Sequence, residues 1–364
     1  MRTMGQVAIV HDYLTQRGGA ERVVLAMVAA FPGAPVYTSV YEPSGTFPEF
    51  AAVDVRPLWT NRIGWLRHDH RRGLPIYPMA FGSCRADADV VICSSSGFAH
   101  GVRTAGRKIV YCHTPARWLY DEAQTYLTNW PAIVRIAART VRAPMRAWDR
   151  RAAGTADAVL TNSGAVRNRI AELYGLEATV APPPAGLSAS GPRRRVEGVE
   201  PGFVLTVGRL LAYKNVDAVV RAMAELPTVR LVVAGTGPEQ ARLEAASGPN
   251  VTLVGAVDEA ELRWLYDNCA GLVSASFEDF GLTPVEAALH GRPAAVLRRG
   301  GFLDTVIEGT TGVFFDEPSA LAAAQAITEM IATTWCHKTL TSHGAQYSQE
   351  AFTRALTEAA ACST

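Results

Sequence analysis

The stretch FVLTVGRLLAYKN (203–215) opens with a short apolar run and passes through Gly208 into a segment that carries Arg209 and Lys214. An apolar run without alternation is typical of a strand covered on both faces, as in a parallel sheet. In such sheets ligands bind beyond the carboxyl ends of the strands, so these three residues stand where a ligand is expected. Two cations there suit a diphosphate, and a solvated pair of charges is the alternative.

Eight further apolar runs share this pattern and alternate with helical periodicity: VAIV (7–10), DVVIC (89–93), KIVYC (108–112), DAVLT (157–161), RLVVA (230–234), VTLV (251–254), GLVSA (271–275) and AAVL (294–297). Strands that alternate with helices predict an α/β protein, and 364 residues exceed a single typical domain. We therefore expect two Rossmann-like, doubly wound domains that face each other across a cleft. Their predicted bounds are 1–182, joined by a helix at about 340–360, and 203–335, with a Pro-, Gly- and Arg-rich linker at 183–202.

The composition is that of a globular protein, with 48% hydrophobic and 19% charged residues, and no apolar run is long enough to span a bilayer. Six cysteines without a C-x-x-C pair predict buried thiols in a reducing cytosol, so we expect a cytoplasmic protein. The net charge of +1 divides into +7 through residue 185, from 21 basic and 14 acidic residues, and −6 over the remainder, from 14 and 20. We expect no nucleic-acid partner.

Two features of the first half lie at predicted strand ends. Gly18 and Gly19 precede a helical pattern, where backbone N–H groups can approach a phosphate or a sugar; a plain loop is the alternative. His113 follows the run KIVYC, so we expect it at a strand end that faces the cleft, with a structural histidine as the alternative.

The stretch SASFEDFGLTPVEAALHG (274–291) contains two glutamates. Thr283, Pro284 and Glu286 have the spacing of a capping box, which predicts a helix that begins at about Pro284 and ends at the next glycine. Glu278 then lies before the helix, beside a Phe-Gly turn whose free N–H groups attract anions. Glu278 is therefore a candidate for binding a polar ligand, and surface charge is the alternative.

AGTGPEQ (234–240) places Gly235 and Gly237 in a tight turn between a strand and a helix. It departs from the dinucleotide fingerprint G-x-G-x-x-G because Gln240 stands at the third glycine, which argues against a hydride-transfer enzyme. No cluster of His and Cys has metal-ligand spacing, and we expect no metal requirement.

These motifs together resemble a known family. EDFGLTPVE (278–286), GRLLAYKN (208–215), AGTGP (234–238) and GGFLDTVIEGTTGVFF (300–315) occur in the order found in retaining glycosyltransferases of the GT-B fold, the large family of α-mannosyl- and α-glucosyltransferases. In the first half, GGAERVV (18–24), YCHTPARWLYD (111–121) and TNSGAVRNRI (161–170) are similar to bacterial polysaccharide mannosyltransferases of this family. The resemblance covers nearly the whole chain.

The resemblance implies roles for single residues. Arg209 and Lys214 would bind the donor diphosphate, Glu278 the hydroxyls of the transferred sugar, and Glu286 the nucleotide ribose while it also caps its helix. His113 would lie near the anomeric centre. Further implied contacts to the donor come from Gly18, Gly19, Gly208, Gly237, Phe280, Gly281 and Leu282. One departure is Asp304 in GGFLD, where the family often has Glu.

The implied activity is hexosyl transfer with retention and without a metal, from a nucleotide sugar to a glycan or lipid-linked acceptor in polysaccharide biosynthesis. The likeness of HTPARWLYD (113–121) favours GDP-mannose as the donor. The cations and the helix N-terminus would stabilise the leaving diphosphate. The alternatives are a UDP-sugar glycosyltransferase, a nucleotide-sugar epimerase, a non-catalytic sugar-nucleotide binding protein, and a glycoside hydrolase, which needs two carboxylates but no paired cations.

Five arginines recur at helical spacing: Arg135, Arg139, Arg142, Arg146 and Arg150. Pro144 lies within this stretch and favours its division into two helices. We expect the arginines to dock the protein peripherally on an anionic membrane surface at the cytoplasmic leaflet, close to a lipid-linked acceptor; a solvated helix face is the alternative.

Overall fold

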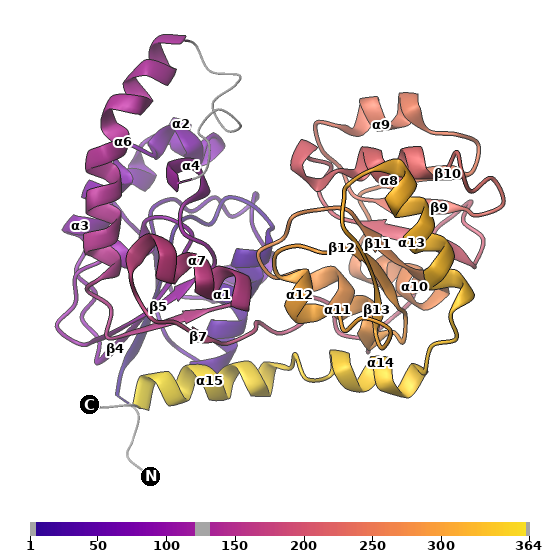
Figure 1. The fold of residues 1–364 in the computed structure, drawn as a ribbon. Helices are drawn as coiled ribbons and strands as arrows, with labels where there is room; N and C mark the ends of the chain where they lie inside the picture. The colour runs from indigo at the N-terminus through magenta and orange to yellow at the C-terminus, as the bar shows by residue number, and fades with distance from the viewer. Residues whose placement is uncertain (1–4, 121–131, 362–364) are drawn as a thin grey trace. The chain divides into compact units, whose positions relative to one another are not determined.

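The computed structural model describes residues 5–120 and 132–361, and for residues 132–141 it describes the backbone alone. The chain forms two compact units, which are described separately (Figure 1). The first contains the residues up to Pro184 together with those from Gln349 on, and the second is Ala185–Ser348. None of the helices in the described ranges combines the length and the apolar character that crossing a membrane requires.

The first unit is built on seven parallel strands in the order β3-β2-β1-β4-β5-β6-β7. The strands are β1 (Val7–His11), β2 (Val36–Thr38), β3 (Val55–Pro57), β4 (Val90–Ser95), β5 (Arg107–Cys112), β6 (Ala158–Thr161) and β7 (Thr179–Val180). The short β2, β3 and β7 were not predicted. The chain order reverses between β1 and β4, which is the point of an open α/β sheet where ligands bind.

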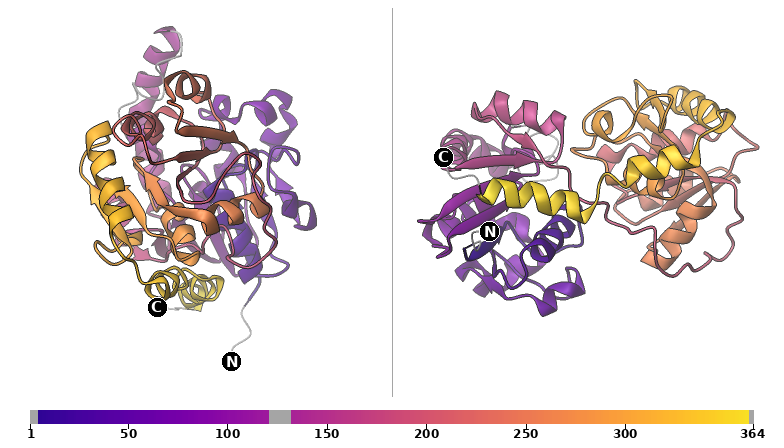
Figure 2. Two further views of the ribbon diagram at one scale, coloured as in Figure 1. Left: turned by 90° about the vertical axis from the view of Figure 1, so that its right-hand side faces the viewer. Right: turned by 90° about the horizontal axis from the view of Figure 1, so that it is seen from below.

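Helices cover both faces of this sheet, and short 3₁₀ turns connect them. Within the described residues the α-helices are α1 (Gly19–Ala30), α2 (Gly64–His68), α3 (Tyr77–Ser83), α4 (Arg117–Tyr120), α6 (Ala132–Ala153), α7 (Gly164–Tyr174) and α15 (Gln349–Ala361). Helix α15 packs beside α1 through Phe352 and Leu356, which are buried with Met27 in one apolar core (Figure 2). The other face of the sheet is covered by a second core that includes Tyr77 and Phe81 of α3.

The second unit has six parallel strands in the order β10-β9-β8-β11-β12-β13. They are β8 (Phe203–Val207), β9 (Leu231–Ala234), β10 (Val251–Gly255), β11 (Cys269–Ser274), β12 (Ala294–Leu297) and β13 (Gly312–Phe315), of which β13 was not predicted. Its helices are α8 (Val216–Ala222), α9 (Gln240–Ala246), α10 (Glu259–Asn268), α11 (Leu282–Leu289), α12 (Phe302–Thr305), α13 (Ala320–Ala332) and α14 (His337–Gly344), and a 3₁₀ turn spans Ala212–Lys214. Here the chain order reverses between β8 and β11.

Apolar cores on both faces of each sheet explain why the strand sequences lack alternation. The prediction of two Rossmann-like domains with parallel sheets is confirmed. Residues 185–202 contain no helix or strand, and Leu187, Val196 and Val199 from this segment are buried in the core of the second unit. Cys93, Cys112 and Cys269 are buried thiols, as predicted, whereas Cys84 is half-buried and Cys336 is exposed.

Two local predictions are wrong. Helix α11 begins at Leu282 after Gly281, whose φ of 91° ends the preceding loop, and no side chain caps it. The capping box built on Thr283 therefore does not form, because both of its residues already lie inside the helix. Helix α6 continues through Pro144 without a break, so the arginine stretch belongs to one helix and not to two.

Candidate functional site

The predicted site residues of the second unit gather at the carboxyl ends of β8 and β11. Gly208 follows β8 with a φ of 153°, and a Cβ added to it would meet nothing within 4 Å. Arg209 is exposed, and its guanidinium makes no hydrogen bond or ion pair with any residue of the described ranges. A small pocket at this place is lined by Arg209, Lys214 and Ser276. An anion that entered it would meet an open glycine turn and two cations.

Lys214, which lines this pocket, forms an ion pair with Glu278, and 20% and 24% of the two side chains are exposed. The hydroxyl of Ser276 donates a second hydrogen bond, of 2.7 Å, to the same carboxylate oxygen. The family resemblance assigns Lys214 to the diphosphate and Glu278 to the sugar, and in the structure these two side chains bind each other. A diphosphate that recruited Lys214 would compete directly with Glu278.

The loop that carries Phe280 and Gly281 is fixed by the following loop. The N–H of Gly301 donates to the carbonyl of Glu278 at 2.8 Å, and a Cβ added to Gly281 would lie 2.5 Å from the ring of Phe302. Gly281 is therefore required both for its backbone conformation and for this packing. It leaves the N-terminus of α11 with Leu282 as its first residue and no side-chain cap, where an anion is favoured.

Glu286 lies on the second turn of α11 and is buried. Its Oε2 accepts a 2.9 Å hydrogen bond from the hydroxyl of Tyr266 on α10. Burial, together with the Glu286 carboxylate, raises the pKa of Tyr266 well above its ordinary value. Glu286 is thus oriented from a neighbouring helix and not through its own helix cap. Asp304, the predicted departure from the family pattern, is exposed on α12.

Gly237 has a structural reason to be glycine. A Cβ added to it would lie 2.3 Å from the carbonyl oxygen of Leu210, because the loops after β8 and β9 run against each other. The N–H of Leu210 donates to the carbonyl of Thr236 at 2.9 Å and holds them together. This close packing accounts for Gly237 without a ligand, whereas the open space at Gly208 does not account for that glycine.

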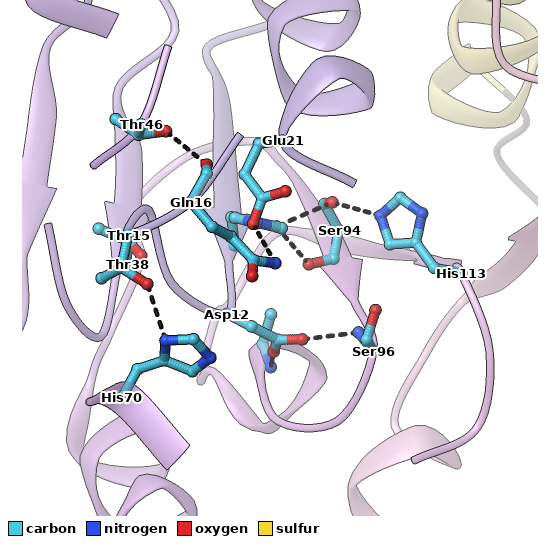
Figure 3. Close-up of polar contacts among 12 residues, drawn as sticks. Asp12, Thr15, Gln16, Glu21, Thr38, Thr46, His70, Ser94, Ser96 and His113 are labelled. Atoms are coloured by element: carbon cyan, nitrogen blue, oxygen red, sulfur yellow. Dashed lines mark hydrogen bonds and ion pairs between the residues drawn. The ribbon is translucent and has the colours of Figure 1, made fainter. Parts of the chain in front are cut away.

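In the first unit, a buried chain of polar side chains runs from α1 to β5 at the carboxyl ends of the strands (Figure 3). His113 follows β5, and its Nε2 lies 2.8 Å from the hydroxyl oxygen of Ser94. That oxygen lies 3.0 Å from Nδ1 of His11, whose Nε2 lies 3.9 Å from Oε1 of Glu21. Gln16 donates a hydrogen bond of 3.1 Å to the same oxygen of Glu21.

The electrostatics of the two histidines differ. Burial, with a further contribution from nearby His11, lowers the pKa of His113 to about 3. Burial alone would also lower the pKa of His11, but the hydrogen bonding and charge of Glu21 raise it above its ordinary value. At neutral pH His113 is therefore uncharged, whereas Glu21 favours the charged form of His11.

Gly18 and Gly19 lie at the start of α1, where Gly18 is the N-cap and Glu21 occupies the first turn. A Cβ added to Gly18 would lie 2.6 Å from Oε2 of Glu21. Asp12, directly after β1, accepts hydrogen bonds from the backbone N–H groups of Ser96, Phe98 and Ala99 and fixes the loop after β4. The glycine turn thus lies against a buried carboxylate.

His11, Asp12, Glu21 and Ser94 were not predicted from the sequence. A signal existed for His11 and Asp12, because they follow the apolar run VAIV at a strand end as His113 follows KIVYC. Ser94 and Glu21 carry no such signal, since serines within strands and glutamates in the first turn of a helix are ordinary.

The predicted arginine stripe is partly engaged by the protein itself. The Nε groups of Arg142 and Arg146 donate to the carbonyl of Leu119 at 2.7 and 3.0 Å, and that of Arg150 donates to the carbonyl of Leu173 at 2.9 Å. The side chains of Arg135 and Arg139 lie outside the described residues. Membrane docking through this helix stays a prediction. In the described ranges, no group of three or more His, Cys, Asp and Glu is arranged to hold a metal ion.

Comparison with known proteins adds to this geometry. A family model described as "Glycosyl transferases group 1" matches residues 192–338, and one described as "Glycosyltransferase Family 4" matches residues 17–187. The chain is 29% identical over 188 residues to a GDP-mannose-dependent alpha-(1-6)-phosphatidylinositol dimannoside mannosyltransferase of Mycobacterium tuberculosis, covering 48% of this chain and 49% of that protein. It is 35% identical over 131 residues to a glycogen synthase of Thermus thermophilus, covering 34% and 30%. The chain thus spans about a third to a half of the length of these curated relatives.

The fold is similar over almost the full chain to that of a solved structure, Anabaena HepE in complex with UDP and glucose. The TM-score is 0.70 with 18% sequence identity, and the match covers 97% of this chain and 98% of that one. At 18% sequence identity, this likeness concerns the fold alone.

Proposed function

Because the chain belongs to the GT-B glycosyltransferases, with a Family 4 domain followed by a group 1 domain, we propose that it transfers a hexose from a nucleotide sugar to a glycan or lipid-linked acceptor. The observation that carries the proposal is the pocket where the strand order of the second unit reverses. Exposed Arg209 and paired Lys214 lie there beside Glu278, and the uncapped start of α11 follows. This combination suits a diphosphate with an attached sugar.

In this proposal Arg209, Lys214 and the N-terminus of α11 bind the diphosphate and stabilise the charge that develops on it as the sugar leaves. Glu278 exchanges its bond to Lys214 for the hydroxyls of the sugar. Glu286, held by Tyr266, accepts from the ribose. His113 lies near the anomeric carbon. The reaction proceeds with retention of the anomeric configuration and requires no metal.

We propose GDP-mannose as the donor, supported by the name of the mycobacterial relative, a GDP-mannose-dependent mannosyltransferase. The name of the Thermus relative points to a glucosyl donor, and HepE binds UDP and glucose, so UDP-glucose is the second candidate.

The test is to incubate the purified chain with GDP-mannose, UDP-glucose and related nucleotide sugars, with and without a glycan and lipid extract. The proposal expects nucleoside diphosphate to be released only with the extract, and an α-linked product by NMR from an α-linked donor. Equal release with and without chelator supports independence from metal. Conversion of the donor sugar without acceptor identifies an epimerase, and tight binding without any turnover identifies a binding protein.

A further inference from the structure

The buried chain in the first unit fixes the positions of its own hydrogen atoms. Nδ1 of His11 lies 3.1 Å from the carbonyl oxygen of Ser94, which can only accept a hydrogen bond. Nδ1 therefore carries a hydrogen. The hydroxyl oxygen of Ser94, 3.0 Å from the same nitrogen, cannot donate to it and can only share that hydrogen.

The single hydroxyl hydrogen of Ser94 is then directed to its other neighbour, Nε2 of His113, at 2.8 Å. Nε2 of His113 thus acts as an acceptor. An uncharged imidazole with an acceptor at Nε2 carries its hydrogen at Nδ1. His113 Nδ1 makes no hydrogen bond with any residue in the ranges that the structure describes.

Glu21 secures the direction of this chain from its other end. Its side chain is 1% exposed and lies 3.9 Å from Nε2 of His11, so the buried carboxylate favours a hydrogen on that nitrogen as well. With a hydrogen on Nδ1, His11 cannot accept from Ser94, and the order of donors cannot reverse. Gln16 holds the carboxylate in place by its 3.1 Å hydrogen bond.

We infer that Glu21, His11 and Ser94 are positioning residues that hold His113 with its hydrogen on Nδ1, so that His113 offers an N–H donor to the substrate and does not act as a base. The inference deepens the proposed function, on which it rests for the statement that His113 meets the substrate. A donor at this point binds a sugar hydroxyl or an oxygen of the leaving group. Removal of the proton from the acceptor hydroxyl then falls to another group.

Other titratable side chains face the two histidines from the neighbouring elements. They are Asp12 and Tyr13 after β1, Glu21 on α1, and Tyr111 on β5. Asp12 is engaged by three backbone N–H groups, which leaves Glu21 as the carboxylate beside the His11 ring. Changes at Glu21 are therefore expected to act on His11 first.

The direct test is long-range ¹H–¹⁵N NMR of the full chain with ¹⁵N-labelled histidine, in which His113→Gln assigns the His113 signals. We expect the neutral Nδ1–H form of His113 from about pH 5.5 to 8.5, well above its lowered pKa, and a His11 pKa that falls in Glu21→Gln. His113 with its hydrogen on Nε2, or a charged His113 in this range, overturns the inference. So does a His11 pKa that is unchanged in Glu21→Gln.

Kinetics of Ser94→Ala supply the second test. This variant removes the donor to His113, and we expect kcat to fall at least about 10-fold while the KM for the nucleotide sugar changes less than about 2-fold. Thr161→Val is the matched control, because it removes another fully buried hydroxyl, which donates to the carbonyl of Cys112 at 3.0 Å. Equal losses in the two variants overturn the inference. If the wild type transfers no sugar, the proposed function is refuted. The NMR experiment still determines the tautomer of His113, because it needs no substrate.

Discussion

Replacing Glu278 with Gln should tighten the binding of a nucleoside diphosphate while it slows sugar transfer. In the structure Glu278 holds Lys214 in an ion pair that the diphosphate must break before it gains that cation. A nucleoside diphosphate without its sugar offers nothing to the freed carboxylate. Glu278 therefore competes with the nucleoside diphosphate product for Lys214, whereas it binds the sugar of the intact donor.

The size of the effect follows from the burial of the pair. Exposed ion pairs contribute about 0.2–1 kcal/mol, and a pair with 20% and 24% of its side chains exposed belongs near the upper end of that range. About 1 kcal/mol corresponds to a roughly 5-fold lower Kd for the nucleoside diphosphate. Loss of a charged hydrogen bond to the sugar costs about 1.5–3 kcal/mol in the transition state, which slows transfer by roughly 10- to 100-fold.

Isothermal titration with the nucleoside diphosphate measures the first number, and turnover with the nucleotide sugar measures the second. Glu308→Gln is the matched control, since it removes one charge from another ion pair of the second unit, with Arg298. In a Lys214→Met background, Glu278→Gln should no longer change the Kd. The reasoning is refuted if Glu278→Gln weakens the binding of the nucleoside diphosphate, or if Glu308→Gln tightens that binding equally.

Three further changes test other parts of the second unit. Arg209→Ala should weaken the binding of the nucleoside diphosphate by about 10-fold or more. The Tm should not change, because the guanidinium has no partner in the described ranges. Calorimetry and a thermal melt check the two expectations. Tyr266→Phe should lower the free energy of unfolding by about 1–3 kcal/mol in urea, since it removes the 2.9 Å hydrogen bond to the buried carboxylate of Glu286, and an unchanged midpoint would contradict this. Gly281→Ala should cost more in unfolding free energy than Gly309→Ala, because both have positive φ but only the first adds a Cβ at 2.5 Å from a ring carbon of Phe302; equal losses would contradict it.

The strands of both sheets were predictable wherever they are long and buried on both faces, because a short uninterrupted apolar run between turn residues is typical of such a strand. The strands that were missed are short or lie toward a sheet edge, such as Val36–Thr38 and Thr179–Val180, and their stability comes from pairing with a neighbour and not from their own composition. The break expected at Pro144 failed for a related reason. Arg146 and Arg150 bind carbonyl groups of neighbouring elements, and this tertiary anchoring outweighs the local cost of a proline.

For the site, the sequence could place residues at strand ends but could not pair them. Nothing in the spacing of Lys214 and Glu278 indicates that they bind each other, because the contact depends on β8 and β11 being neighbours in the sheet. The capping-box pattern at Thr283 is present in the sequence, but the helix starts before it, after Gly281. Gly281 starts the helix earlier, since the loop must pass Phe302, and Glu286 is then free to meet Tyr266.

The two units place their polar groups at the same topological position but in different physical states. In the second unit the cations are exposed or only partly buried, and the ion pair of Lys214 with Glu278 is open to exchange, which suits a substrate that must bind and leave at every turnover. In the first unit His11 and His113 are buried and joined through Ser94, with Glu21 beside His11, so on our inference their order of donors is set before any ligand arrives. Exchangeable charge favours capture and release of a nucleotide sugar. A hydrogen-bond donor fixed in place, such as Nδ1–H of His113, favours a single geometry for the reacting sugar, because the protein need not rearrange when charge develops.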